Sequence, residues 1–247
     1  MFCRRRQTFC ANALKVENIL NLGDTVERGY HPREVVERLR ALQHIVPVVS
    51  LLGNHDEALL FGRPVSGSDI KSRQAHALCA NCAPFLRTLP HCYLDVDNRI
   101  IAVHGGPIDP RELGDGWLFE RSWQRIASTS YLDASGYHYT PEAAFRYVKR
   151  EYGGGYVILC GHEHEEAAYS DRAGDLLGAM HAQQNRFAGY EIRSRWVERD
   201  RATSYLIQVG IAGPEGYRNS VGLNRAHFGL VWHHDKREKI GLFSFPI

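Results

Sequence analysis

Short apolar runs alternate with amphipathic stretches along the first part of the chain. Ile19–Leu22 is an apolar run that ends at Gly23, which predicts a buried strand. Residues 32–43 begin with a proline and place four apolar side chains at helical spacing, which predicts a helix. The β-branched run at residues 46–53 (VPVVSLLG) predicts a second buried strand. Strand, helix and strand together predict a crossover unit with two parallel strands.

The same design returns twice later in the chain. Residues 99–106 (RIIAVHGG) and 155–164 (GYVILCGHEH) each predict a buried strand with a histidine just after it. Ligands of open α/β sheets gather at the carboxyl ends of the strands. Four predicted strands bring candidate side chains to such ends: Asp24, Asn54, His104 and His162.

The remaining segments give weaker signals of secondary structure. Residues 107–152 predict a helical insertion near the site, with a helix over 141–152 (PEAAFRYVKREY). Residues 165–202 are polar and show no clear period. Residues 202–247 hold three apolar stretches that predict closing strands, which we expect to be antiparallel. The chain shows no internal repeat and no linker that would divide it into two domains.

Composition narrows the class of protein. A chain of 247 residues that is 44% hydrophobic can form one domain with a full core. Its net charge of +2 does not favour a nucleic acid or a membrane surface as partner. No apolar run approaches the roughly 20 residues that a membrane helix needs. Six cysteines, including the single C-x-x-C pair Cys79 and Cys82, predict reduced thiols in a cytoplasmic protein.

The four strand-end side chains suit a divalent metal ion. Carboxylate, amide and imidazole donors together favour Mn²⁺, with Fe, Zn²⁺ and Mg²⁺ as alternatives. A carboxylate such as Asp24 can bridge two ions about 3.5–4 Å apart, as two-metal hydrolases require, so one or two ions per chain are expected. His55 follows Asn54 directly and is placed to protonate a departing oxygen. Arg28 could bind phosphate oxygens in a fork, and Arg125 could provide a second such contact.

Four short motifs carry a resemblance to a known family. In chain order they are GDTVERG at 23–29, GNHD at 53–56, VHGG at 103–106 and GHEH at 161–164. Together they resemble the calcineurin-like metallophosphoesterase superfamily, in the branch of the phosphoprotein phosphatases and symmetrical diadenosine tetraphosphatases. The resemblance implies an α/β fold, a four-layer αββα sandwich of two mixed β-sheets flanked by helices.

The resemblance also implies roles for individual residues. It makes Asp24 the bridging carboxylate, His55 the general acid, Glu27 the carboxylate that orients it, and Arg28 the arginine that binds phosphate. The implied metal ligands are Asp24, Asn54, His104, His162 and, for a further ion, His164. The implied reaction is the hydrolysis of a phosphate ester by a metal-bound hydroxide. The substrate would be a phosphorylated protein or small molecule, with dinucleoside polyphosphates as the alternative.

One part of the family pattern is missing from the sequence. Members of the family begin with a strand that ends in D-x-H-G, whereas residues 1–23 hold no aspartate and no histidine. We therefore expect residues 1–17 to be an N-terminal remnant or truncated segment, and residues 18–247 to be the metallophosphoesterase domain. A catalytically impaired or inactive metal-binding homologue stays open as an alternative, because ligands of the first ion are lacking.

Overall fold

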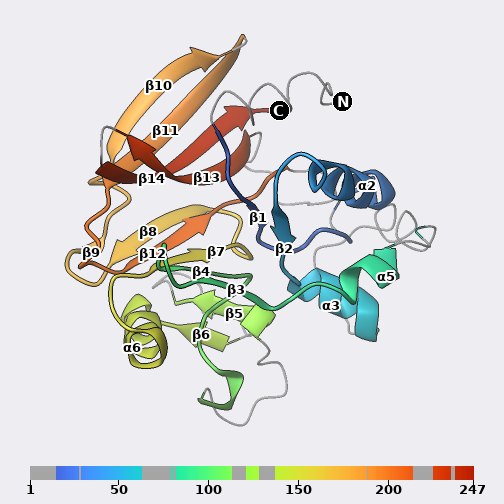
Figure 1. Ribbon diagram of the computed structural model, residues 1–247, viewed down its shortest axis with the longest axis horizontal. Coiled ribbons are helices and arrows are strands. Elements are labelled where there is room, and N and C mark those ends of the chain that lie inside the picture. The colour runs from blue at the N-terminus through green and yellow to red at the C-terminus, as the bar shows by residue number, and fades with distance from the viewer. Residues whose placement is uncertain are drawn as a thin grey trace.

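The computed structural model describes residues 15–27, 29–62, 79, 82–112, 121–127, 137–187, 189–213, 225–234 and 237–247. Its central feature is a mixed six-stranded sheet, which a second, antiparallel sheet covers (Figure 1). The strand order of the six-stranded sheet is β3 (Cys92–Asp95), β4 (Ile100–Val103), β7 (Val157–Cys160), β12 (Tyr205–Val209), β8 (Glu166–Ser170) and β9 (Gly174–Asp175). Strands β4, β7 and β12 run parallel, so their carboxyl ends share one edge of the sheet.

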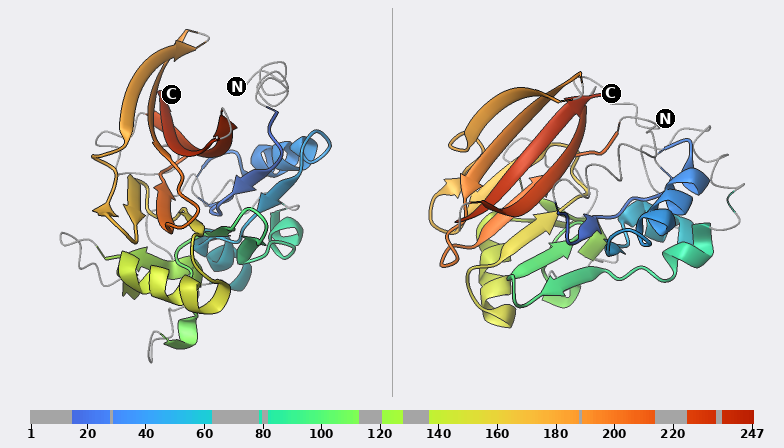
Figure 2. Two further views of the ribbon diagram at one scale, coloured as in Figure 1. Left: turned by 60° about the vertical axis from the view of Figure 1, so that its left-hand side comes forward. Right: turned by 45° about the horizontal axis from the view of Figure 1, so that its top comes forward.

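The second sheet has four long strands. Their order is β10 (His181–Phe187), β11 (Tyr190–Glu198), β14 (Arg237–Pro246) and β13 (Arg225–His234). The hairpin of β10 and β11 extends beyond the six-stranded sheet (Figure 2). The sequence showed no period over much of β10 and β11 because most of their side chains, on both faces, are exposed or half-buried rather than packed.

The two faces of the six-stranded sheet bury different apolar clusters. In β12, Leu206 packs with the cluster that includes α6 (Pro141–Tyr152), whereas Ile207 packs with Ile240 and Leu242 of β14. Successive side chains of a strand point to opposite faces, so this one apolar strand serves both layers. The helix α6 begins where predicted, because the Thr140 side chain accepts a hydrogen bond of 3.2 Å from the backbone N–H of Ala143.

The N-terminal part of the described chain forms the predicted crossover unit. Strands β1 (Ile19–Asn21) and β2 (Val48–Ser50) are parallel, and α2 (Pro32–Leu42) connects them. Helices α3 (Asn54–Phe61) and α5 (Cys82–Leu86) lie beside this pair, on the side where α2 is found (Figures 1 and 2). Apolar side chains from the helices and from the loops after β1 and β2 form a third buried cluster. The pair of strands forms a sheet of its own in the structure.

The segment 107–152, which was predicted as a helical insertion, holds strands as well as a helix. It contains the 3₁₀ turns η1 (Pro110–Glu112) and η2 (Arg121–Trp123), the parallel pair β5 (Gln124–Ile126) and β6 (Tyr137–Tyr139), and α6. Three-residue strands are too short to show a period of two in the sequence, so only the helix was predicted.

The cysteines differ from the prediction. Cys79 and Cys82 form a disulfide, so the expectation of reduced thiols is wrong for this pair. Cys92 and Cys160 are free. In the part of the chain that the structure describes, no helix is long and apolar enough to span a bilayer.

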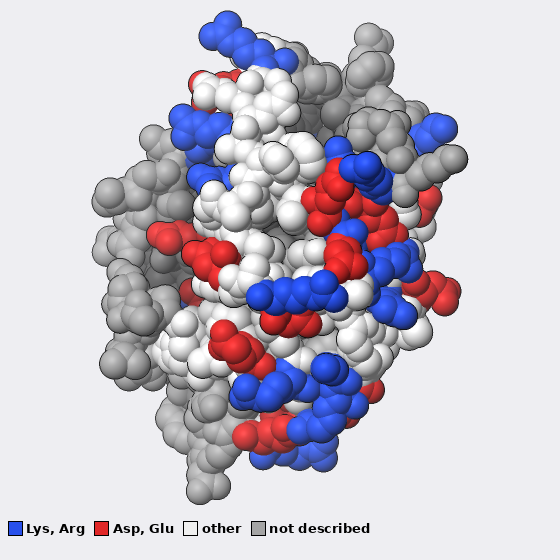
Figure 3. All heavy atoms as spheres, turned by 90° about the vertical axis from the view of Figure 1, so that its left-hand side faces the viewer, with Lys and Arg blue, Asp and Glu red and all other residues white. Residues whose placement is uncertain are grey.

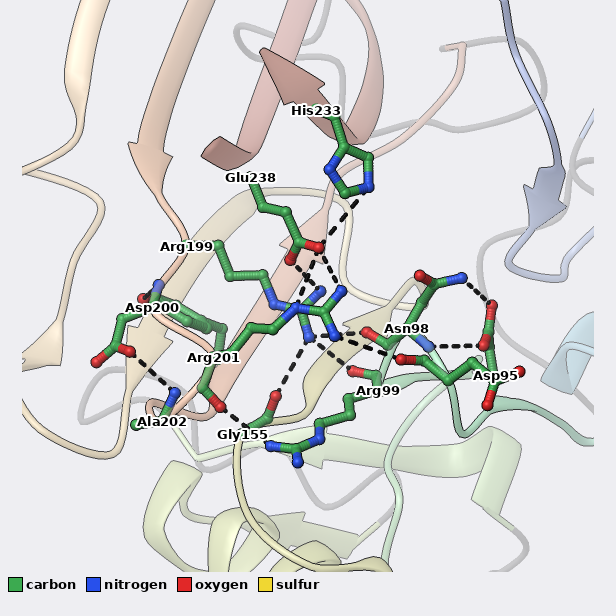
Figure 4. A network of polar contacts seen from close by, with 12 residues as sticks. Asp95, Asn98, Arg99, Gly155, Arg199, Asp200, Arg201, Ala202, His233 and Glu238 are labelled. Atoms are coloured by element: carbon green, nitrogen blue, oxygen red, sulfur yellow. Dashed lines mark hydrogen bonds and ion pairs between the residues drawn. The ribbon is translucent and has the colours of Figure 1, made fainter. Parts of the chain in front are cut away.

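A buried arginine connects the two sheets at the end away from the strand-end loops (Figure 4). The Arg199 side chain is 1% exposed and lies 3.0 Å from a carboxylate oxygen of Glu238. It also donates to the carbonyl oxygens of Asn98 at 2.8 Å, Arg99 at 3.2 Å and Gly155 at 3.2 Å. These carbonyls precede β4 and β7, so the arginine holds the amino ends of both strands against the second sheet.

Replacing Arg199 by methionine tests this connection. The change leaves Glu238 with Arg201 but removes the buried donor, so we expect the free energy of unfolding to fall by about 3 kcal/mol. Urea denaturation measures the loss. Arg237→Met is the control, because Arg237 forms an exposed pair with Glu198, and it should change stability little. Equal losses in the two variants would contradict the structural role of Arg199.

Candidate metal centre

Four loops meet at the carboxyl ends of β1, β2, β4 and β7. Each loop carries one of the predicted ligands, and the Oδ1 atom of Asn54 lies 3.1 Å from Nε2 of His104 and 2.9 Å from Nδ1 of His162. The two ring nitrogens are 3.2 Å apart. Oδ1 of Asp24 lies 3.4 Å from Nε2 of His104. The structure thus brings together four donor atoms from segments far apart in the chain.

The spacing of these donors fits the coordination shell of a small divalent ion. Metal–ligand bonds of about 2.1 Å place neighbouring donors about 3.0 Å apart at right angles and about 3.4 Å apart in a tetrahedron. The observed separations of 2.9 to 3.4 Å lie in this range. The residues present therefore fit an ion of the size of Mn²⁺, Fe²⁺ or Zn²⁺.

The protonation of His104 supports the same conclusion. Its Nδ1 atom lies 2.6 Å from the carbonyl oxygen of Leu22, which can only accept, so Nδ1 carries the proton. In the neutral ring Nε2 then presents a lone pair to the cluster, where Oδ1 of Asn54 is also an acceptor. Two buried acceptors that face each other need a cation or a proton between them.

Burial and neighbouring charges shift the pKa values of the side chains at this centre. Burial raises the pKa of Asp24, but the nearby rings of His104 and His55 outweigh it, and the pKa lies well below its ordinary value. Burial lowers the pKa of His104, but Asp24, the Leu22 carbonyl group and Asp56 together outweigh it, and the pKa lies above its ordinary value. Burial, His104 and Arg125 hold the pKa of His162 well below its ordinary value. His162 is therefore neutral near pH 7 and has a lone pair for a metal.

A buried carboxylate outside the donor set holds two of the loops together. Asp56 accepts hydrogen bonds from the backbone N–H groups of Thr25 at 3.2 Å, Val26 at 3.1 Å and Gly53 at 2.9 Å. Burial and the charge of Asp24 raise its pKa to about 7 in spite of these bonds. Asp56 is the fourth residue of GNHD, and nothing in the sequence marks it for this role.

The loops approach each other very closely. A side chain at Gly53 would place its Cβ atom 2.2 Å from the backbone nitrogen and from Oδ1 of Asp24, so only glycine fits there. Asp24, Glu27 and His162 have φ angles of 51°, 73° and 62°, in the left-handed region. Such residues cost of order 1–3 kcal/mol each and persist where the surrounding structure enforces them, often at functional sites.

The predicted general acid His55 and its partner Glu27 lie next to the four donor atoms. Nδ1 of His55 is in a short contact with Oε2 of Glu27, and both side chains are largely buried. The backbone N–H of His55 donates to Oδ1 of Asp24 at 3.0 Å, which fixes the histidine beside the ligand set. With Nδ1 directed at the carboxylate, Nε2 is the ring atom that can exchange a proton with a bound molecule.

Two predicted site residues are not in this group. His164 is described, but its ring does not belong to the group of donor atoms that lie within 4.8 Å of one another. Its carbonyl oxygen accepts a bond of 3.3 Å from the backbone N–H of Ile211. Arg28 lies outside the described residues, so its predicted contact with phosphate stays a prediction.

Comparison with known proteins identifies the family. The model of the family described as calcineurin-like phosphoesterase matches residues 6–166. The chain belongs to the calcineurin-like phosphoesterase family. All five predicted metal ligands lie within the matched range, as do the loops that carry them.

Solved structures share the fold of the phosphoesterase. A metallophosphoesterase from Sphaerobacter thermophilus aligns with a TM-score of 0.56 at 19% identity, over 95% of this chain and 80% of that chain. A hypothetical protein of Pyrococcus horikoshii OT3 aligns with a TM-score of 0.50 at 18% identity, over 96% of this chain and 78% of that chain. No curated protein was matched by sequence. The likenesses show the mixed α/β fold with packed sheets that was predicted.

Metal affinity tests the donor set. We expect the metal-free protein to bind Mn²⁺ in isothermal titration calorimetry, and Asn54→Ala or His104→Ala to weaken binding at least about tenfold, because each removes a direct donor. His181→Ala is the control, since His181 is an exposed histidine of β10. Unchanged affinity in both donor variants would contradict the assignment.

Proposed function

We propose that this protein is a Mn²⁺-dependent hydrolase of phosphate esters. The observation that carries the proposal is the convergence of four donor atoms beside the buried pair of His55 and Glu27. Membership of the calcineurin-like phosphoesterase family supports hydrolytic chemistry at this place.

The donor set defines where the ion would be held. Asp24, Asn54, His104 and His162 would bind it, and mixed oxygen and nitrogen donors suit Mn²⁺. A bound divalent ion supplies a Lewis acid that activates water and neutralises charge on a phosphate. The protein contributes the rigid position of the ligands, which Asp56 and the Leu22 carbonyl group secure from behind.

His55 is placed to protonate the leaving oxygen. Glu27 holds the ring in one orientation, because the carboxylate faces Nδ1. A serine or threonine alkoxide is a strong base and departs slowly unless it is protonated as the bond to phosphorus breaks. Nε2 of His55 would give its proton to that oxygen.

Arg125 is the described cation best placed to bind the phosphoryl group. It lies on β5, between two residues whose backbones are held near the site, and its positive charge adds to burial and His104 in lowering the pKa of His162. A guanidinium group can donate two parallel hydrogen bonds to phosphate oxygens. Arg125 would thus hold the substrate beside the ligands, together with the predicted contact from Arg28.

The proposed substrates are phosphomonoesters of the phosphoserine or phosphothreonine type. On the face drawn in Figure 3, basic and acidic side chains of the described residues are interspersed. A small phosphoryl group needs only the local cations of the site. Diadenosine tetraphosphate belongs in the same assay panel, because preferred cleavage of that compound would replace the phosphomonoester assignment.

The effect of His55→Ala should depend on the leaving group. With a phosphoserine peptide we expect kcat to fall by about 10²–10⁴, the usual share of a general acid. With p-nitrophenyl phosphate the loss should be smaller, because nitrophenolate leaves without a proton. Affinity for Mn²⁺ should change little, since the hydrogen bond from His55 to Oδ1 of Asp24 comes from its backbone N–H, which the substitution keeps.

Two outcomes would count against this proposal. Full kcat of His55→Ala with the peptide would remove the general-acid role. Absence of turnover by the wild-type protein with Mn²⁺, Fe²⁺ and Zn²⁺ would overturn the hydrolase proposal and favour a metal-binding homologue without activity.

A further inference from the structure

A short segment, residues 121–126, is tied to three of the loops that carry the metal ligands. Glu57, three residues after Asn54, accepts hydrogen bonds from Ser122 and Trp123. Gly106, two residues after His104, donates its backbone N–H to the Arg121 carbonyl oxygen at 3.0 Å. The side-chain carboxylate of Glu163, next to His162, accepts the backbone N–H of Ile126 at 2.9 Å. The position of the segment is therefore coupled to the metal centre.

The contact with the loop after His104 is especially close. A Cβ atom at Gly105 would lie 2.5 Å from the carbonyl oxygen of Arg121 and 2.6 Å from that of Gln124. The side chain of Gln124 donates to the Ile108 carbonyl oxygen at 2.7 Å, which holds the segment from the same side. The backbone of the segment thus rests directly on the loop.

The tie through Glu57 uses a buried carboxylate. Glu57 is 2% exposed, and its Oε2 atom lies 2.5 Å from the Ser122 hydroxyl oxygen and 3.0 Å from Nε1 of Trp123. The ring of His91 lies 3.5 Å from the other carboxylate oxygen. A buried carboxylate is costly unless it is hydrogen-bonded, so Glu57 and its two donors stabilise one arrangement of α3 against η2.

The segment carries Arg125 beside the loop that holds His162. Gln124 and Ile126 are buried, at 0% and 6% exposure, so the side chain between them points to the opposite side of β5. Arg121 has another role, because its guanidinium group donates to the Tyr147 hydroxyl at 3.1 Å. The residue after Arg125, Ile126, is hydrogen-bonded to Glu163 beside His162, so Arg125 is the arginine of this segment that is left near the metal ligands.

We propose that Glu57 is a positioning residue for substrate binding. It holds Ser122 and Trp123 so that Arg125, two to three residues later, stays aligned with the metal ligands of the adjacent loops. The inference rests on the proposed function, because it assigns Arg125 to the phosphoryl group of the substrate. The helix α3, which begins with Asn54 and His55, thus also sets the position of the arginine that would bind phosphate.

A double-mutant cycle tests the coupling of Glu57 to Arg125. In the Mn²⁺-loaded protein, Glu57→Ala should weaken the binding of inorganic phosphate and raise KM for a phosphoserine peptide, each about tenfold, with a smaller change in kcat, as loss of one aligned charged hydrogen bond predicts. In the Arg125→Ala background the same substitution should have no further effect, because its target is gone.

The conservative variant separates positioning from charge. The amide oxygen of Glu57→Gln can still accept both hydrogen bonds, so phosphate affinity should stay within about twofold of the wild type. Leu59→Ala is the matched control on α3, since Leu59 packs in the apolar cluster. It should lower the melting temperature of the metal-free protein and leave phosphate affinity unchanged.

Other outcomes would overturn the inference. They are unchanged phosphate affinity in Glu57→Ala, additive losses in the double variant, or an equal loss in Leu59→Ala. If Glu57→Ala fails to fold, Ser122→Ala combined with Trp123→Phe removes the same two bonds from the other side and must show the same coupling. A wild-type protein that neither binds phosphate nor turns over defeats the proposed function itself, whereas the outcomes above, in an active wild type, defeat only the role of Glu57.

Discussion

The structure depends on a small group of buried polar atoms that need a cation or protons between them. Oδ1 of Asn54, Nε2 of His104 and Nδ1 of His162 lie within 3.2 Å of one another, and Asp24 adds a carboxylate. In a protein interior such a group is stable only with protons or a cation among its members. The parallel strands, the close loops and the buried Asp56 all serve to hold these atoms in place.

The rigid loops around the metal centre contain strained backbone, and buried interactions far from the centre stabilise the fold. Three residues of the site adopt positive φ angles, and Gly53 allows two loops to touch. The buried network of Arg199 lies at the other end of the strands and joins the two sheets without touching the site (Figure 4). Stability and function are thus concentrated at opposite ends of β4 and β7.

The donor set could be predicted because each ligand follows an apolar run whose end is visible in the sequence. Parallel strands then bring those ends to one edge, which is a general property of α/β sheets. The segment 121–126 could not be predicted in this way, since a three-residue strand has no period. Glu57 resembles an ordinary helix-surface acid in the sequence, and only the fold shows it buried against Ser122. The disulfide between Cys79 and Cys82 was not predicted, because reduced thiols were inferred from an expected cytoplasmic location and the sequence does not show how close the two sulfur atoms lie.

The further ion stays a prediction. His164 was assigned to it through the resemblance, and its ring lies outside the group formed by Asp24, His104 and His162. The central claim concerns the ion held by that group together with Asn54. Crystals soaked in Mn²⁺ and measured at the manganese absorption edge test it most directly. It predicts one anomalous peak at about 2.0–2.3 Å from Oδ1 of Asp24, Oδ1 of Asn54, Nε2 of His104 and Nδ1 of His162. Bound Mn²⁺ found only at other residues would contradict it.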